Sequence, residues 1–354
     1  MARGFALVSA VLVAGLVAGI TTLLVTRQQY LVDAASGMKD SLEAERAVEA
    51  LEVRALAFLA RPGHRASPGT SASLDGDLSV EAAAGTPRAF GHLSMLDGRF
   101  NLATLAQQSA MVAEDGTDKE EFAGLGVAAE RLRASAEGVI QSSGSGPSGP
   151  RARSRPLMPQ EVASARFVLL LRALGIDTSV AKAVLDWVDA DSEARGGEGA
   201  EDDFYSRLDP PYRAANRAFS SVSELLRVRG ITPQIYARLA PHVVALGEVS
   251  SVHLNSASEE VLMSIGPDID QQTARALVLS RQAKPWTSVA EFLASPALQT
   301  HPVLAHGLAV HSLFYRLDAT VELGGSSIRF HSTLKRLGAT QVAVIQRERA
   351  YGTP

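Results

Sequence analysis

The apolar run from Phe5 to Val25 constrains the fold of this chain more than any other feature. It reads FALVSAVLVAGLVAGITTLLV, without a charged residue or a proline, and it is preceded by Arg3-Gly4 and followed closely by Arg27. A run of this length can cross a bilayer as one helix. Because Arg3 stands just before it, the positive-inside rule favours a cytoplasmic N-terminus, with the remaining chain on the other side of the membrane.

The residues after this run also favour a helix. From Gln28 to Ala60 there is no proline, Gly37 is the one weak point, and charged residues are mixed with Leu, Val and Ala. The apolar segment is therefore expected to continue into one long, partly polar helix.

The residues around Gly4 resemble the processing site of type IV pilins and type II secretion pseudopilins. A basic residue, Gly4 and a large apolar Phe5 lead into an unbroken apolar helix. In that class a prepilin peptidase cuts after the glycine, so the resemblance implies a mature chain that begins at Phe5 and is N-methylated. On these residues alone an ordinary signal anchor remains an alternative.

Ser9 stands at the fifth mature position, where most members of the class carry Glu. A carboxylate inside a bilayer is costly unless it is paired. In pilins this Glu is thought to pair with the amino terminus of a neighbouring subunit, and a subunit at the end of the fibre lacks one such neighbour. The absence of Glu is what a resemblance to the K-type minor pseudopilin family implies, with Ser9 as the membrane-assembly position.

Composition sets further bounds on function. The 354 residues suffice for a membrane helix and about two modest domains. A net charge of −4 and a pI of about 6.1 give no global basic field for nucleic acid. The chain has no cysteine, which excludes disulfides and thiol catalysis.

Short alternating runs predict strands at two places in the chain. Residues 61–85 read as a loop with one short strand, and Asp97-Gly98 between the runs 90–96 and 99–102 predicts a β-hairpin. Near the C-terminus, residues 317–323 and 328–335 alternate between apolar and polar, with Gly324-Gly325 as a turn, and a third run, 341–346, follows Gly338. These runs predict an antiparallel meander with one buried face.

The middle of the chain has helical spacing. Helices are expected over 120–140 and 160–174, with a flexible Ser-, Gly- and Pro-rich loop between them. Residues 219–244 and 254–293 each read as two helices around a glycine turn, and both resemble helix-hairpin-helix and SAM-like modules. In the second unit the turn Gly266-Pro267-Asp268-Ile269-Asp270 places a proline and two acids where a phosphate would approach, so these units are expected to contact protein rather than DNA.

The most acidic stretch runs from Asp186 to Asp209. It contains nine carboxylates, only two arginines and several glycines. Calcium takes six to eight oxygens from a loop that can wrap around it, and an acidic glycine-containing loop suits this. The spacing is not that of an EF-hand, so the pattern alone leaves a solvated acidic loop and a metal site both open. No apolar pocket is evident that would raise the pKa of one acid above another, so no catalytic use is expected.

The segments WVDAD, GAEDDFY and DPPYRAANRAFSSVSEL resemble the central block of the K-type minor pseudopilin family. That family is described as binding calcium in this region. The resemblance therefore implies calcium as a cofactor, with ligands at Asp189, Asp191, Glu201, Asp202 and Asp203.

Taken over nearly the whole chain, the resemblance implies an α+β, type IV pilin-like fold with a large inserted helical domain. It divides the chain into a leader (1–4), a transmembrane and extended helix (5–60), the first part of the pilin β-domain (61–105), an inserted helical domain (106–302, in units of about 106–215 and 216–302) and closing strands (303–354).

The implied function is that of a non-enzymatic minor pseudopilin at the tip of a type II secretion pseudopilus. Its implied partners are the I- and J-type minor pseudopilins, the major pseudopilin and the prepilin peptidase, with one pass through the inner membrane, most of the chain in the periplasm and no nucleic acid. Two alternatives remain: a membrane-tethered DNA-uptake receptor that uses the helical modules, and a membrane-anchored periplasmic enzyme.

Overall fold

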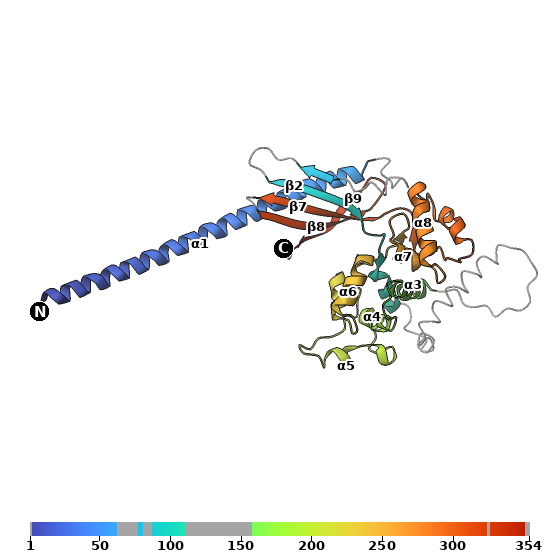
Figure 1. The fold of residues 1–354 in the computed structure, drawn as a ribbon, viewed down its shortest axis with the longest axis horizontal. Helices are drawn as coiled ribbons and strands as arrows, with labels where there is room; N and C mark the ends of the chain where they lie inside the picture. The colour runs from blue at the N-terminus through green and yellow to red at the C-terminus, as the bar shows by residue number, and fades with distance from the viewer. Residues whose placement is uncertain (1, 62–76, 81–86, 111–157, 324–325, 351–354) are drawn as a thin grey trace, which may run out of the picture.

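The computed structural model describes the chain except for residues 1, 62–76, 81–86, 111–157, 324–325 and 351–354. It combines helices and strands (Figure 1). The α-helices are α1 (Ala2–Leu59), α3 (Pro159–Ala173), α4 (Val180–Val188), α5 (Asp202–Tyr205), α6 (Pro233–Leu239), α7 (Glu259–Met263), α8 (Gln271–Ala283) and α9 (Val289–Leu293). The strands are β1 (Asp77–Val80), β2 (Arg88–Met95), β3 (Phe100–Asn101), β4 (Val243–Val244), β5 (Val252–His253), β6 (Leu308–Ala309), β7 (Phe314–Leu323), β8 (Ser326–Arg336) and β9 (Val342–Ala350). The 3₁₀ helices are η1 (Leu102–Ala110), η3 (Gly196–Glu198), η4 (Val222–Arg227), η5 (Ala240–His242) and η6 (Pro296–Leu298).

The predicted long N-terminal helix is confirmed as α1, which projects as a rod well beyond the rest of the molecule (Figure 1). Apolar side chains such as Leu16, Ile20 and Leu24 are exposed along this projection. No helix within the described part of the chain meets the length and hydropathy expected of a bilayer-spanning segment.

Several sequence predictions fall on residues that the structure does not describe. The surroundings of Gly4, Phe5 and Ser9 lie outside what the structure describes, as do the predicted helix 120–140 and the Gly324-Gly325 turn. These stay predictions.

The predicted C-terminal meander is confirmed, and its strands form the larger part of a five-stranded sheet in the order β1-β2-β7-β8-β9. All four pairings are antiparallel. β2 pairs with β7 along its whole length, from Arg88 opposite Glu322 to Met95 opposite Tyr315. The sheet therefore joins strands from both ends of the chain.

The C-terminal part of α1 packs on one face of this sheet. Its buried residues recur at helical spacing, which places them on one stripe: Ala44, Val48, Leu51, Ala55 and Leu59. Gly91 in β2 allows close approach, because a Cβ there would lie 2.8 Å from Leu317 Cδ1 and 3.5 Å from Leu51 Cδ1. A buried polar contact fixes the same interface, since Glu52 accepts hydrogen bonds from Ser332 Oγ at 2.6 Å and from Arg347 Nε at 2.8 Å.

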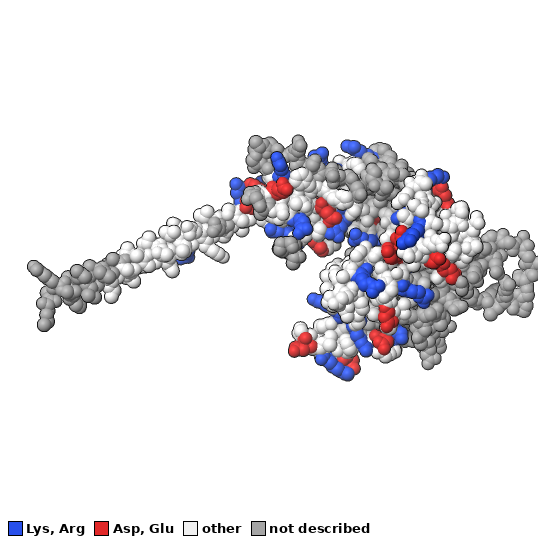
Figure 2. Space-filling model, viewed as in Figure 1, with Lys and Arg blue, Asp and Glu red and all other residues white. Residues whose placement is uncertain are grey.

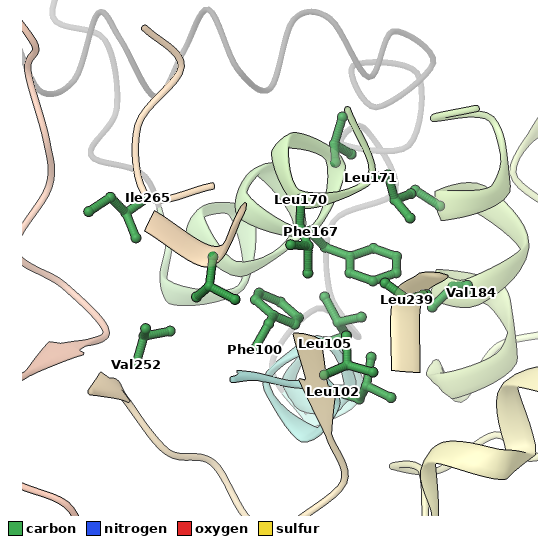
Figure 3. Close-up of a cluster of buried hydrophobic side chains, with 14 of the residues drawn as sticks. Phe100, Leu102, Leu105, Phe167, Leu170, Leu171, Val184, Leu239, Val252 and Ile265 are labelled. Atoms are coloured by element: carbon green, nitrogen blue, oxygen red, sulfur yellow. The ribbon is translucent and has the colours of Figure 1, made fainter. Parts of the chain in front are cut away.

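Between β2 and β7 the chain leaves the sheet and forms a separate helical block (Figure 1). Its core gathers apolar side chains from β3, η1, α3, α4, α6 and α7, including the tilted pair Phe100 and Phe167 with ring centroids 5.6 Å apart (Figure 3). Two short parallel pairs, β3 with β4 and β5 with β6, connect distant parts of the block. The block therefore has its own hydrophobic core beside that of the sheet.

The predicted hairpin at Asp97-Gly98 is wrong. β2 pairs with β1 and β7, and β3 pairs with β4, so the two flanking runs do not pair with each other. The Asp97 carboxylate instead accepts hydrogen bonds from Ser312 Oγ at 2.7 Å and from Leu313 N at 2.6 Å. These contacts join the segment just after β2, where the chain leaves the sheet, to the segment just before β7, where it returns.

Replacing Asp97 with asparagine is expected to destabilise this corner by about 2 kcal/mol. The Asp97 side chain is buried, and its two carboxylate oxygens accept hydrogen bonds from Ser312 Oγ and Leu313 N. In the variant the amide NH₂ group would face one of these donors, so one hydrogen bond would be lost. Urea unfolding of the variant should shift to lower denaturant, whereas Asp203→Asn should not shift, because the Asp203 side chain is 85% exposed. Equal unfolding midpoints for the two variants would contradict the role given to Asp97.

The two predicted helical units differ from expectation in detail. The first helix of the first unit is only the 3₁₀ helix η4, which is followed by α6. In the second unit α7 and α8 are α-helices, and Asp270 caps α8 by accepting from Thr273 N at 2.7 Å. One of the two acids at this turn, Asp270, is thus used to cap the helix.

Candidate metal centre

Three buried carboxylates meet where α4 ends and α5 begins. Asp186 lies in the last turn of α4, Asp189 is its C-cap residue and Glu201 is the N-cap residue of α5. One oxygen from each carboxylate lies within 4.8 Å of the others. Because nearly every residue of α4 is buried, Asp186 and Asp189, three residues apart, are held on one inward face of the helix end.

The loop between the two helices closes tightly over Asp186. The Oδ2 atom of Asp186 accepts hydrogen bonds from Arg195 N at 3.1 Å and from Ala200 N at 2.8 Å. A Cβ on Gly199 would lie 2.3 Å from that same oxygen, so the loop can pass there only as glycine. Any larger residue at 199 would displace the loop.

Arg229 holds this loop from its other side. Its Nη1 atom donates to the carbonyl oxygens of Gly197 at 3.0 Å and Gly199 at 2.8 Å, and its guanidinium lies 4.7 Å from the centre of the Phe204 ring. Trp187 in α4 and Tyr205 in α5 pack edge to face, with ring centroids 5.1 Å apart. These contacts therefore hold the loop and the two helix ends that carry the acids.

The carboxylates are not neutralised by the groups around them. Glu201 is 4% exposed, yet neither of its carboxylate oxygens has a hydrogen-bond donor among the described residues, and the same holds for Asp189 Oδ1. Arg195 pairs with Asp186 and Asp189, which leaves three acids facing one guanidinium. Buried polar oxygens are rarely left without partners, so this group of atoms suits a bound cation.

Burial shifts the pKa values of all three acids upward. Burial, followed by the charges of Asp189 and Asp186, raises the pKa of Glu201 to about 8. Burial raises the pKa of Asp189 to about 6, and it raises the pKa of Asp186 although hydrogen bonds from Arg195 and Ala200 oppose the shift. The prediction from sequence that no pocket would raise the pKa of one acid above that of another is therefore wrong.

Comparison with known proteins places this site within a family. A family model described as "Type II secretion system (T2SS), protein K" matches residues 98–248, and a second model with the same description matches residues 252–311. Together the two matches span more than half of the chain. The chain belongs to the type II secretion system protein K family. The three carboxylates lie inside the first of the two matched regions.

Relatives in this family are about one third identical to the chain over the residues that align. Protein K of Pectobacterium carotovorum subsp. carotovorum is 36% identical over 194 residues, which cover 51% of this chain and 58% of the relative. Protein K of Pseudomonas aeruginosa is 33% identical over 207 residues, which cover 56% and 60%. The chain thus spans under two thirds of the length of these relatives.

A solved structure has the same fold as this protein K family member. A chain of the crystal structure of the GspK-GspI-GspJ complex from the enterotoxigenic Escherichia coli Type 2 Secretion System matches with a TM-score of 0.60. The match covers 89% of this chain and 99% of the other at 20% sequence identity. At that identity the likeness concerns the fold.

The five predicted metal ligands in this protein K family member do not all meet. Asp189 and Glu201 lie in the cluster of three acids found among the described residues. The carboxylate of Asp191 instead accepts from Glu193 N, that of Asp202 accepts from Ala214 N at 2.9 Å, and Asp203 pairs with Arg207 on the surface. Asp191 still lies near enough for its charge to help raise the pKa values of Asp189 and Glu201.

Asp186 is the member that sequence reasoning missed. It stands three residues before Asp189 in a strongly apolar helix, which puts both acids on the same helix face. That spacing was the signal that could have identified it.

The DNA-receptor alternative finds no support in these comparisons, which match protein K of the secretion system. On the face drawn in Figure 2, basic and acidic side chains are interspersed over the sheet and the helical block. A broad basic surface, which duplex DNA requires, is not seen on that face.

Proposed function

We propose that this protein is a minor pseudopilin at the tip of the type II secretion pseudopilus, where it supports the export of folded proteins across the outer membrane. Membership of the protein K family supports this role. The observation that carries it is the long projecting helix α1, whose C-terminal part packs on an antiparallel sheet (Figure 1). The role is structural rather than enzymatic.

The arrangement of α1 and the sheet suits a type IV pilin-like fold with an insertion. The helical block interrupts the sheet between β2 and β7 and lies at the end of the sheet away from the projecting part of α1 (Figure 1). A block of this size would obstruct packing between neighbours in the interior of a filament. A position at the tip avoids that obstruction.

The protein is also proposed to be anchored in the membrane and to assemble with other pseudopilins. The apolar run from Phe5 to Val25 would anchor the chain in the inner membrane by a single pass, with most of the chain in the periplasm. The prepilin peptidase would cut between Gly4 and Phe5. The structurally similar chain comes from a complex of GspK, GspI and GspJ, so we expect I- and J-type minor pseudopilins as partners and the major pseudopilin below them.

Mass spectrometry of the N-terminus tests the processing step. The chain extracted from membranes of a host with its prepilin peptidase should begin at Phe5 and carry an N-methyl group. A Gly4→Leu variant should remain uncut and retain Arg3, because the residue before the cleavage point is changed. A wild-type chain that keeps Arg3 and Gly4 in such a host would contradict processing as a pseudopilin.

The carboxylate cluster is proposed as a calcium site, with Asp186, Asp189 and Glu201 as ligands. The donor set is all oxygen, which suits a hard cation such as calcium. The uncompensated buried oxygens of Glu201 and Asp189 support the fit. Bound calcium would supply the positive charge that links the end of α4 to the start of α5.

Calcium affinity is expected to rise with pH, by up to about tenfold per unit between pH 6 and pH 8. The raised pKa of Glu201, about 8, means that the metal-free native protein keeps a proton that an unfolded Glu releases near its ordinary pKa of 4.5. Calcium needs the carboxylate, so it must displace this proton. By the same linkage, the stability of the calcium-free protein should fall as pH rises from about 4.5 to about 8.

Isothermal titration at several pH values and thermal melts in a chelator measure these two slopes. Calcium affinity should rise with pH while the stability of the calcium-free protein falls. A general loss of stability at high pH would not raise the affinity. A calcium affinity that stays constant across this range would contradict the assignment of Glu201 as a buried ligand.

A further inference from the structure

Arg195 lies within the carboxylate cluster, on the loop between α4 and α5. Its Nη1 atom donates to Asp186 Oδ1 at 2.7 Å and also contacts Asp189 Oδ2. Its backbone N–H separately donates to Asp186 Oδ2. The guanidinium thus engages two of the three acids through the oxygens that a cation would use.

The third acid shows that one guanidinium does not satisfy the cluster. Glu201 is only 4% exposed, and both of its carboxylate oxygens lie in buried surroundings without a donor among the described residues. One of its oxygens lies within 4.8 Å of oxygens of Asp186 and Asp189. Glu201 nevertheless accepts no hydrogen bond from Arg195. This unpartnered acid is the independent sign that a more highly charged ligand belongs in the site.

Arg195 and a divalent cation would compete for the same oxygens. Two positive groups sharing the carboxylates of Asp186 and Asp189 would lie a few ångströms apart in buried surroundings, where like charges repel strongly. Calcium also requires six to eight oxygens, and an oxygen whose lone pair accepts from the guanidinium is a poorer ligand. Binding of the cation therefore requires the guanidinium to leave.

The loop allows this movement. The Arg195 side chain is 23% exposed, so one edge of it already faces solvent. The next residue, Gly196, adopts a left-handed φ of 68°, and a Cβ placed on Gly196 or Gly197 would meet no atom within 4 Å, so the surface beside the loop is open. Because the backbone N–H of Arg195 holds Asp186 Oδ2 by itself, the side chain can rotate outward while the loop stays in place.

We propose that Arg195 is a tethered competitor for the cation site. Without metal it holds Asp186 and Asp189 together, and it swings into solvent when calcium binds to the three carboxylates. The inference rests on the proposed calcium site and adds its regulation: Arg195 lowers the affinity and favours divalent over monovalent cations, since a single positive charge gains nothing by replacing another.

Calcium titration of the full-length chain in detergent tests the competition. Arg195→Gln should bind calcium about tenfold more tightly than the wild type, and it should melt at a lower temperature in a chelator, because the cluster then has no counter-charge. The matched control is Arg207→Gln, which removes an exposed ion pair with Asp203 on the same segment and should leave both values unchanged.

The possible failures are distinct. A wild type that binds calcium together with an Arg195→Gln variant of equal or weaker affinity would overturn the competitor role and leave the calcium site standing. A wild type and variant that both fail to bind calcium would overturn the site and the competitor role together.

Chemical labelling of the wild type gives a second test that needs no variant. Phenylglyoxal modifies accessible guanidinium groups, so Arg195 should be protected in a chelator and labelled when calcium saturates the site. Arg207, whose side chain is 73% exposed, should be labelled equally in both conditions. Unchanged labelling of Arg195 under saturating calcium would overturn the proposed movement.

Discussion

Replacing Glu201 with glutamine is expected to lower calcium affinity by about a hundredfold or more. The variant keeps the size of the side chain but removes the charge of the one acid in the cluster that has no protein donor. The same change should raise the melting temperature of the calcium-free protein by about 2–4 °C at pH 9, where Glu201 has lost the proton that it holds below a pKa of about 8. The reason is that an uncompensated buried carboxylate is replaced by an amide whose N–H groups can donate to the neighbouring Asp189.

The opposite signs make this prediction specific. Thermal melts in calcium and in a chelator, combined with calcium titration, give both values for each variant. Asp203→Asn is the matched control, because Asp203 is acidic, lies two residues from Glu201 and pairs with Arg207 on the surface. A Glu201→Gln variant that behaves like Asp203→Asn would contradict the three-carboxylate site.

Replacing Leu51 with alanine is expected to destabilise the α1–sheet interface by about 3 kcal/mol. Leu51 is fully buried at the centre of this interface and packs beside Gly91 and Leu317. Glycine at 91 brings the strand close to the helix, so the cavity left by the variant cannot collapse easily. Hydrogen exchange of amides in the C-terminal part of α1 should accelerate about a hundredfold when opening occurs by separation of the helix from the sheet.

Val53→Ala provides the control in the same helix. Val53 is 65% exposed, so its truncation should change exchange by less than about threefold. Hydrogen exchange followed by mass spectrometry on peptides from α1 and β7 separates this interface from the helical block, which has its own core. Equal exchange in the two variants would show that α1 does not depend on this packing.

The elements predicted well from sequence are those specified by local periodicity. The long helix α1 and the strands β7 to β9 follow from apolar spacing and the absence of proline, and neither depends on where the partner lies in the chain. The hairpin at Asp97-Gly98 failed because the partner of β2 is β7, far along the sequence. A turn signal carries no information about such a distant competitor.

The site was predicted in part for the same physical reason. The resemblance of the acidic segments pointed to Asp189 and Glu201, and the structure brings these two together. The burial that shifts their pKa values depends on the closure of the loop at Gly199 and on the packing of Trp187, which are tertiary contacts. The competing contact of Arg195 is equally invisible in the sequence, where it is one basic residue in an acidic run.

Assembly with other minor pseudopilins tests the central claim most directly. The full-length chain should be co-expressed with the I- and J-type minor pseudopilins of the same organism, extracted in mild detergent and analysed by size-exclusion chromatography with mass measurement. We expect the three proteins to elute together as one complex. Elution of this chain apart from an I–J complex, at concentrations where those two associate, would contradict its role as a minor pseudopilin.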